Sequence, residues 1–441
     1  MNATVAIYSI TSGLHDEAAV KAISDEFLGG IFGSAGDSAA GAAPYLWKGA
    51  DFSDFGSEPL SLIYVRTGGA EGIFKNLLPG MLEKGAKCFY LLTSGKSNSL
   101  AASLEILSYL RQRGLKGEVL HGGPEYLRGR IGLLAKVEAA RRALAGQRIG
   151  ILGHPSDWLI SSTWDDAALK ERLGLTLDYM PMEEVLAVLK DPALLVPGPF
   201  SRATDKPFAG SPDVADAFDV PEVLPMSRDI RASFPGAVRI YRALKSIIAE
   251  RGLGALTLRC FDLLGTVHNT GCYALAQLNS EGIPSSCEGD VPALLSMMVA
   301  QALTGCTGFQ ANPARIDVET GEMLFAHCTI PFNIVEDCYC YDTHFESGIG
   351  VGIHGHFPIG PVTVFKLSGS LDRAFIAEGE ALRNQKEPDL CRTQVWLRLR
   401  PEDARYFLTD PIGNHHILIP GHHGTLLAEF IRTCCAFPVN V

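Results

Sequence analysis

The stretch Cys287-Glu288-Gly289-Asp290-Val291-Pro292-Ala293 lies between a short loop and an apolar run that continues to Leu303. This pattern predicts the start of a helix, so secondary structure flanks Glu288 on both sides. A carboxylate held in this way suits a metal ligand or a catalytic base. The alternative is structural, because acidic residues at a helix start also cap free N–H groups and complement the helix dipole. The stretch alone leaves both interpretations open.

Length and composition limit the class of protein. The 441 residues exceed one ordinary hydrophobic core and suggest two or three domains. A hydrophobic content of 47% with 20% charged residues is typical of a soluble globular protein. The net charge of −11 argues against nucleic acid or an anionic membrane as partner. No apolar run reaches the roughly 18 residues of a membrane span, and the N-terminus lacks a signal-peptide pattern, so we expect a cytoplasmic protein.

The cysteines favour free thiols. Their number, 11, is odd, and their spacing is irregular. Cys338-Tyr-Cys340 and the adjacent Cys434-Cys435 do not form the paired CxxC sets of a structural zinc site. Buried free cysteine packs as a small hydrophobic residue, and we expect this role for most of them.

Residues 1 to 145 alternate between β-rich runs and helical patterns, which predicts an α/β domain with a parallel sheet. The β-rich runs are residues 5–10, 61–65, 88–93 and 118–120, and the helical patterns are residues 17–27, 71–84, 97–113 and 124–145. The Gly/Ala-rich residues 29–44 are interpreted as a long loop. A new strand at residues 148–153 marks a domain boundary near residue 146.

Residues 146–330 are predicted to form a second α/β domain, which carries Glu288, and residues 331–441 a β-rich domain, plausibly a small barrel with His415. Within the second domain we expect a long surface loop with a short helix at 191–225, helices at 236–251 and 268–278, a strand at 256–261, a strand-like turn at 305–312 and a strand at 323–327. In the third we expect strands at 350–354, 362–367 and 395–399 and a helix at 425–433.

Two loops follow predicted strands, where parallel sheets bind ligands. Residues 93–99 contain Gly95-Lys96-Ser97 but lack the upstream glycine of a phosphate-binding P-loop. Ser97 is therefore interpreted as a helix cap, with or without a ligand contact. Residues 153–158 end in Trp158, whose indole is either a platform for a sugar face or part of the core.

Eight of the twelve histidines follow residue 326. Together with Glu288 and Asn312 they offer a mixed carboxylate–imidazole set, which suits Mn²⁺, Mg²⁺ or Co²⁺ better than a thiol-rich zinc site. The alternative is that these histidines only shape the barrel.

Several motifs, taken in order, resemble the L-fucose isomerase-like superfamily, which includes L-arabinose isomerases. They span most of the chain and are specific to the superfamily and not to one substrate. The matching pieces are residues 94–100, 153–159, 259–264, 279–284, 287–290, 325–328 and 410–416, among them Cys287-Glu288-Gly289-Asp290 and Asp410-Pro411-Ile412-Gly413-Asn414-His415-His416.

The resemblance implies two flavodoxin-like α/β domains, a C-terminal β-barrel and a divalent metal, usually Mn²⁺, in an enzyme that interconverts aldoses and ketoses. Glu288 matches a metal-binding glutamate that also acts as a base, and His415 and His327 match histidine ligands. The second carboxylate of fucose isomerase falls at Asn312, which is placed in the catalytic and metal sets. The resemblance also implies a homotrimer or homohexamer with sites between subunits. The predicted substrate-binding residues are Trp158, His154, Ser97, Asn98 and His416.

Asn312 is a departure with chemical consequences. An amide oxygen can bind a metal, but it cannot accept a proton at neutral pH. Glu288 therefore acts alone on carbon while water or a histidine handles the hydroxyl proton, or Asp317 or Glu346 supplies the missing acid, or activity is lost.

The sequence thus predicts a metal-dependent aldose–ketose isomerase that acts on a monosaccharide through a cis-enediol. One alternative is an isomerase-like enzyme for an acidic or sulfonated sugar such as sulfoquinovose, whose charge Arg259, Lys96 and His154 would neutralise. Another is a sugar-binding homologue without catalysis.

Overall fold

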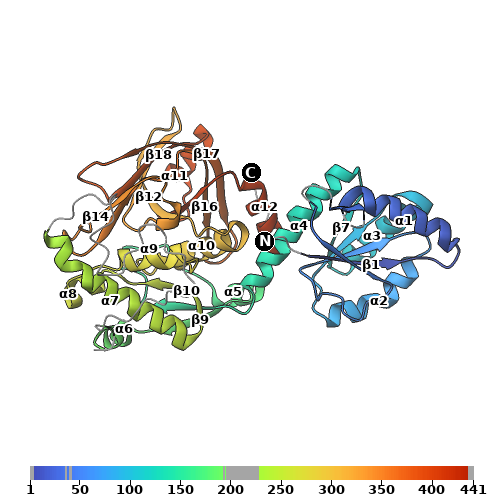
Figure 1. The fold of residues 1–441 in the computed structure, drawn as a ribbon, viewed down its shortest axis with the longest axis horizontal. Coiled ribbons are helices and arrows are strands. Elements are labelled where there is room, and N and C mark those ends of the chain that lie inside the picture. The colour runs from blue at the N-terminus through green and yellow to red at the C-terminus, as the bar shows by residue number, and fades with distance from the viewer. Residues whose placement is uncertain (1–3, 35–36, 39–41, 192–193, 195–227, 436–441) are drawn as a thin grey trace. The chain divides into compact units, whose positions relative to one another are not determined.

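The computed structural model describes the chain except for residues 1–3, 35–36, 39–41, 192–193, 195–227 and 436–441 (Figure 1). It divides into two compact units, Met1–Arg142 and Ala143–Val441. The predicted loop at 191–225 lies almost wholly outside the described residues. Across the described part, no helix combines the length and the apolar character that a membrane span requires.

The first unit is a five-stranded parallel sheet with helices on both faces. The strand order is β4(Tyr45–Gly49)-β1(Val5–Ile10)-β5(Leu60–Val65)-β6(Cys88–Leu92)-β7(Lys116–Leu120), and the helices are α1(Glu17–Phe32), α2(Glu71–Glu83), α3(Ser99–Gln112) and α4(Pro124–Leu144). Counted along the chain, this order is 2-1-3-4-5, as in flavodoxin. Alternate residues of β1 pack against opposite helix layers, because Val5 and Ile7 lie with α1 and α4 whereas Ala6 and Tyr8 lie with α2 and α3.

The Gly/Ala-rich segment differs from the predicted loop. Helix α1 continues to Phe32, and two short strands, β2(Gly33–Ser34) and β3(Asp37–Ser38), follow it. The helix extends because Leu28, Ile31 and Phe32 are buried against the sheet, and this packing outweighs the low helix propensity of Gly29 and Gly30.

The second unit begins with a four-stranded parallel sheet. Its order is β11(Ser285–Cys287)-β10(Leu253–Leu258)-β8(Arg148–Leu152)-β9(Thr176–Met180). Among the described residues of this part of the chain there are six α-helices: α5(Asp166–Leu173), α6(Met182–Leu189), α7(Arg228–Arg251), α8(Asp262–Val267), α9(Cys272–Ser280) and α10(Val291–Thr304). The single helix predicted at 268–278 is wrong at its start, because His268 adopts φ of 50° and ends α8 before α9 begins.

The second unit continues with a closed antiparallel barrel. The strand order is β12(Phe309–Ile316)-β13(Glu322–His327)-β18(Thr393–Arg398)-β17(Ala374–Gln385)-β16(Gly360–Leu367)-β19(His416–Pro420), and a small sheet, β14(Tyr339–Asp342)-β15(Gly352–Gly355), precedes β16. Helices α11(Pro401–Thr409) and α12(Gly424–Cys434) complete the chain's described elements. The fold class predicted from sequence is confirmed. The barrel takes β12 and β13 from before residue 331, and the predicted three-domain division stays a prediction.

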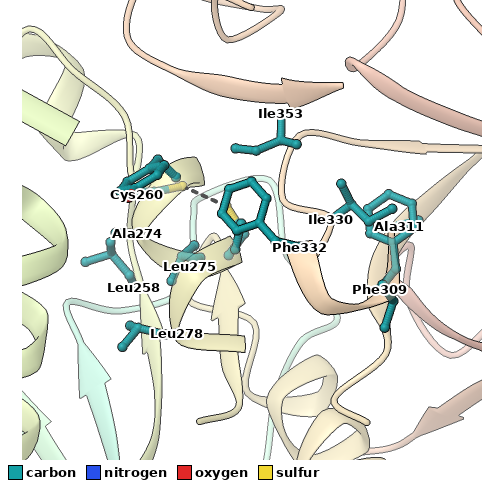
Figure 2. Close-up of a cluster of buried hydrophobic side chains, with 14 of the residues drawn as sticks. Leu258, Cys260, Ala274, Leu275, Leu278, Phe309, Ala311, Ile330, Phe332 and Ile353 are labelled. Atoms are coloured by element: carbon teal, nitrogen blue, oxygen red, sulfur yellow. Dashed lines mark hydrogen bonds between the residues drawn. The ribbon is translucent and has the colours of Figure 1, made fainter. Parts of the chain in front are cut away.

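Helix α10 joins the sheet to the barrel within the second unit. It contacts β10 and β11 on one side and β16 and β19 on the other, and it is visible between these layers in Figure 1. Every residue from Val291 to Ala300 is buried, which explains why this helix is apolar all round. A buried cluster of the second unit that joins the sheet, α9 and the barrel includes Leu258, Cys260 and Phe332, drawn in Figure 2.

The barrel core gives a test of this packing. Phe325 is 0% exposed and contacts the ring of Phe407, whereas Leu408 is 61% exposed. We expect Phe325→Ala to lower the free energy of unfolding by about 3–5 kcal/mol, because it leaves a cavity. Leu408→Ala is the control, with a change within about 0.5 kcal/mol. Urea denaturation measures both, and similar values for the two variants would contradict the packing described.

Candidate functional site

The site forms where three strands of the second sheet end. Residues 153–158 follow β8, residues 259–262 follow β10, and residues 288–290 follow β11. The chain turns from one direction along the sheet to the other between β9 and β10, because β9 and β10 flank β8 on opposite sides. Ligands of such sheets bind beside the carboxyl ends of the strands at this point.

The backbone of Glu288 is held by three separate segments. The Ser156 N–H donates to the carbonyl of Glu288 at 2.9 Å, and the Gly289 N–H donates to the carbonyl of Leu258 at 3.0 Å. The Cys287 N–H donates to the Gln310 side chain of the barrel at 2.9 Å. Glu288 has φ of 65°, a left-handed conformation that is unfavourable for a residue with a Cβ. The surrounding hydrogen bonds hold this conformation, as is common at functional sites.

Gly289 allows the two loops to approach. It has φ of 75°, and a Cβ at this position would lie 2.6 Å from the carbonyl oxygen of His154 and 2.8 Å from the Cα of Pro155. Both obstacles are backbone atoms, so neither can move without displacing the loop. Glycine is therefore required beside Glu288 on two grounds, conformation and space.

The Glu288 carboxylate lies between an indole and two imidazoles. Trp158 donates from Nε1 to Oε2 at 2.6 Å, while Oε1 lies 3.5 Å from His415 Nε2 and 3.9 Å from His327 Nε2. Burial raises the pKa of the carboxyl, but His415 and His327 outweigh it and hold that pKa well below its ordinary value. Glu288 is therefore ionised. Sequence reasoning placed all four of these residues in the site, and the structure brings them together.

Asp290 orients His415 and caps helix α10. One carboxylate oxygen accepts from the Ala293 N–H at 2.8 Å, and the other lies 2.8 Å from His415 Nδ1. Both side chains are 0% exposed. A carboxylate bonded to one ring nitrogen fixes the tautomer and leaves Nε2 free, the arrangement common around metal-binding histidines. The sequence left two interpretations open for residues 287–293, a helix cap and a functional carboxylate. Each applies to a different acid, because Asp290 caps the helix and Glu288 faces the histidines.

Lys366 is a buried cation beside Asp290. Its side chain is 1% exposed and its Nζ lies 3.5 Å from Asp290 Oδ2. Burial lowers the pKa of Lys366. Burial raises the pKa of Asp290, but Lys366 and His415 outweigh it and lower that pKa to about 2. Sequence reasoning missed Lys366, although a single lysine in the apolar strand residues 362–367 was a usable signal.

The donor atoms fit a divalent cation. Two ligands about 2.1 Å from one ion, at an angle near tetrahedral, lie about 3.4 Å apart, close to the 3.5 Å between Glu288 Oε1 and His415 Nε2. Cys287, Glu288 and His327 also offer three ligand atoms within 4.8 Å of one another. Burial and the hydrogen bond to Cys260 raise the pKa of the Cys287 thiol, so a hard cation would be held by Glu288, His327 and His415.

Asn312 carries an unsatisfied buried atom. Its Oδ1 has no hydrogen-bond partner among the residues that the structure describes. An amide oxygen of this kind could complete a ligand set, and its participation stays a prediction.

An aromatic wall extends from the carboxylate. The ring of Trp158 meets Phe261 edge to face at 4.7 Å, and Phe261 meets His344 at 5.4 Å. Trp158 is 52% exposed, so part of its surface is accessible to a ligand. Phe261 and His344 stood in the motifs and the histidine cluster, but their pairing depends on two distant loops and could not be seen from the sequence.

The other predicted substrate-binding residues lie elsewhere or have partners. His154 Nδ1 lies 2.8 Å from Arg259, which also pairs with Asp157 and Asp262. His416 lies 3.1 Å from the Tyr406 hydroxyl and packs on Phe375 and Phe407, and burial lowers its pKa to about 3.

Ser97 and Asn98 belong to the first unit, whose position relative to Glu288 is not defined. Ser97 does not cap helix α3 as predicted. It has φ of 52° and lies in a short 3₁₀ turn, and Asn98 stands at the cap without a side-chain bond.

The two proposed sources of a second acid differ. Asp317 lies in the turn between β12 and β13. This turn is at the opposite end of β13 from His327, which is a distance of roughly 16 Å along the strand. The Asp317 carboxylate accepts hydrogen bonds from the Glu319 and Thr320 N–H groups. Glu346 lies on the β14–β15 loop beside His344. Burial and the charge of Glu288 raise the pKa of Glu346.

Comparison with known proteins reveals relatives among sugar isomerases. The chain is 31% identical over 183 residues to a sulfoquinovose isomerase from a Clostridium species, a match that covers 38% of this chain and 39% of the relative. It is 25% identical over 296 residues to a sulfoquinovose isomerase from Alkalicoccus urumqiensis, covering 65% and 63%. An L-arabinose isomerase from a Nocardioides species is 29% identical over 193 residues, covering 43% and 36%. No protein-family model matches the chain.

We expect Gly289→Ala to destabilise the protein more than a matched glycine substitution. Gly305 has φ of 76°, yet a Cβ there would meet nothing within 4 Å. Gly305→Ala should cost about 1–2 kcal/mol from conformation alone. Gly289→Ala adds the clash with the loop at residues 153–158, so its loss of unfolding free energy in urea should be clearly larger. Equal losses would show that the close approach is absent.

The buried pair of Lys366 and Asp290 gives a second test. We expect Lys366→Met to lower the free energy of unfolding by about 3–5 kcal/mol, because it leaves Asp290 buried without its cation. Combining it with Asp290→Asn removes both charges and should recover part of that loss. A double-mutant cycle by urea denaturation measures the coupling. A coupling near zero would contradict the pairing.

Proposed function

Because the chain is homologous to sulfoquinovose isomerases and to L-arabinose isomerase, of the sugar isomerase superfamily, we propose that it interconverts an aldose and a ketose, with a sulfonated hexose such as sulfoquinovose as substrate. The observation that carries this proposal is the ionised Glu288 carboxylate, held between the Trp158 indole and the imidazoles of His327 and His415. The matched segments leave part of each relative uncovered, so substrate and activity are proposals for this chain.

Glu288 acts as the base on carbon. Oε2 faces Trp158, the open aromatic surface, whereas Oε1 faces the histidines. A carboxylate oxygen has two lone pairs, so Oε2 can accept the indole N–H and still take a proton from C2 of an open-chain aldose. The carboxylic acid exchanges its proton with solvent and delivers a proton to C1 of the cis-enediol, which gives the ketose. The indole hydrogen bond keeps Oε2 in one place for both transfers.

A divalent cation, Mn²⁺ by resemblance, would be held by Glu288, His327 and His415, with Asn312 as a further candidate. Such a cation would polarise the sugar carbonyl and stabilise the enediolate. Asp290 holds His415 with Nε2 directed at the carboxylate, and it depends on Lys366 for charge compensation. This chain's residues therefore prearrange the ligands before a cation enters.

The hydroxyl proton requires a second group, because Asn312 cannot accept it. Glu346 suits this role better than Asp317, since it lies in the loop of His344 and its raised pKa favours a side chain that both gives and takes a proton. His344 lies in the same loop, and burial lowers its pKa to about 4, so it is neutral and can accept a hydrogen bond from a sugar hydroxyl.

The substrate proposal follows the names of several relatives. Arg259 would bind a sulfonate by giving up one of its two ion pairs, with Asp157 or with Asp262. The pair with Asp157 is easier to replace, because the Asp157 side chain is 79% exposed. The second candidate is a neutral pentose, as in the L-arabinose isomerase match. The homotrimer or homohexamer implied by the resemblance is part of the proposal.

The decisive test uses Mn²⁺ and D₂O. We expect the protein to convert sulfoquinovose to its ketose with deuterium at the carbon next to the carbonyl, and Glu288→Gln to reduce turnover by a factor on the order of 10⁴ or more because the base is lost. Trp158→Phe, which keeps the ring but removes the N–H, should retain measurable turnover. Nuclear magnetic resonance follows product and deuterium.

L-Arabinose and glucose serve as the neutral comparison. Turnover confined to neutral sugars would reject the sulfonated substrate but keep the isomerase. Full activity of Glu288→Gln would reject the assignment of the base, and absence of exchange with every sugar would favour a binding protein.

A further inference from the structure

Two thiols meet beside the Glu288 site. Cys260 follows β10 and Cys287 ends β11, and their sulfurs lie 3.1 Å apart (dashed line from Cys260 in Figure 2). Both residues are buried, and β10 and β11 are in register at Leu258 and Cys287, so the sheet itself brings the pair together. Two buried thiols in contact are common in protein cores. Here, however, one of the two, Cys287, also lies close to the Glu288 carboxylate and the His327 imidazole.

The thiol pair extends a ligand set. Cys287 Sγ lies within 4.8 Å of ligand atoms of Glu288 and His327, and those two residues lie 3.9 Å apart at Oε1 and Nε2. Cys260 stands next to this set through the 3.1 Å contact of its sulfur with that of Cys287, and it would bring a second thiol to an ion held there. Two sulfurs bound to one zinc ion lie about 3.8 Å apart, so the pair needs to open by only about 0.7 Å from the observed 3.1 Å.

We propose that Cys260, Cys287, Glu288 and His327 form an alternative binding site for a thiophilic divalent cation such as Zn²⁺ or Cd²⁺. Thiolates prefer soft cations, whereas Mn²⁺ prefers the carboxylate and imidazoles of Glu288, His327 and His415. The two ligand sets share Glu288 and His327, so one cation excludes the other. Resting on the proposed function, the consequence is that thiophilic cations inhibit the isomerase by occupying two of its site residues.

The binding step balances without a redox partner. Each thiol loses its proton to solvent as its sulfur bonds to the cation, so one divalent cation releases two protons and no electrons move. Hard cations, which do not displace thiol protons readily, leave the pair intact.

The test avoids a competing surface group. Asp337, Cys338 and His356 also offer ligand atoms close together, and they are more exposed. Titrations with Cd²⁺ should therefore use the full chain with Cys338→Ser. We expect a thiolate-to-cadmium absorption band that corresponds to two thiolates per ion. Adding Cys260→Ser should halve the band, and adding Cys287→Ser as well should remove it, while adding Cys306→Ser, the control, should leave it unchanged.

Two further measurements keep the proposal falsifiable if a variant folds poorly. On the Cys338→Ser chain, one equivalent of Zn²⁺ should show two sulfur neighbours at about 2.3 Å by X-ray absorption. Bound Mn²⁺, followed by electron paramagnetic resonance, should be released as Cd²⁺ binds. In Cys260→Ser, the Cd²⁺ concentration that releases half of the Mn²⁺ should rise roughly ten-fold or more.

A band that survives both substitutions, zinc without sulfur neighbours, or Mn²⁺ that stays bound would each overturn the proposal. None of these measurements uses turnover. A protein inactive on every sugar can still show the two-thiolate band, and an active isomerase can fail to show it, so the two proposals fail independently.

Discussion

A fully buried hydrogen bond between Asp290 and His415 is the constraint on which the site depends. It joins the loop after β11 to the segment before β19, residues 125 positions apart in the chain. Asp290 also caps α10 and faces Lys366, so the same carboxylate fixes a helix start, a barrel side chain and an imidazole. A buried charge with three such partners has little freedom to move, because each partner would be left unsatisfied.

Much of the architecture could be predicted because its signals are local. Strands β1 and β5, at residues 5–10 and 60–65, are nearly continuous apolar runs, which is typical of strands buried on both faces. Strand β17 was missed for the opposite reason. Its residues Ala374 to Gln385 include alanine, leucine and glutamate, good helix formers, and they form a strand because β16 and β18 pair with both of its edges. Helix α11 was missed as a short segment with few apolar positions.

The candidate site divides in the same way. Glu288, His327, His415 and Trp158 stood in recognisable motifs, and the structure brings them together. The partners that tune them could not be read from sequence, because the pairs Asp290–His415, Asp290–Lys366 and Trp158–Phe261 each join loops or strands far apart in the chain. His416 shows the converse, since its neighbour His415 lies beside Glu288 while its own ring packs among aromatic residues.

Helix α10 has a consequence for how the second unit loses its structure. Its apolar surface is divided between the parallel sheet and the barrel, and neither layer covers it alone. Opening either layer would expose the remaining face to water, so sheet and barrel should come apart as one cooperative body with common amide-exchange kinetics. The Glu288 carboxylate comes from the sheet, and the imidazoles of His327 and His415 come from the barrel. Local fluctuations that leave the sheet and the barrel packed on α10 should therefore also leave these side chains aligned.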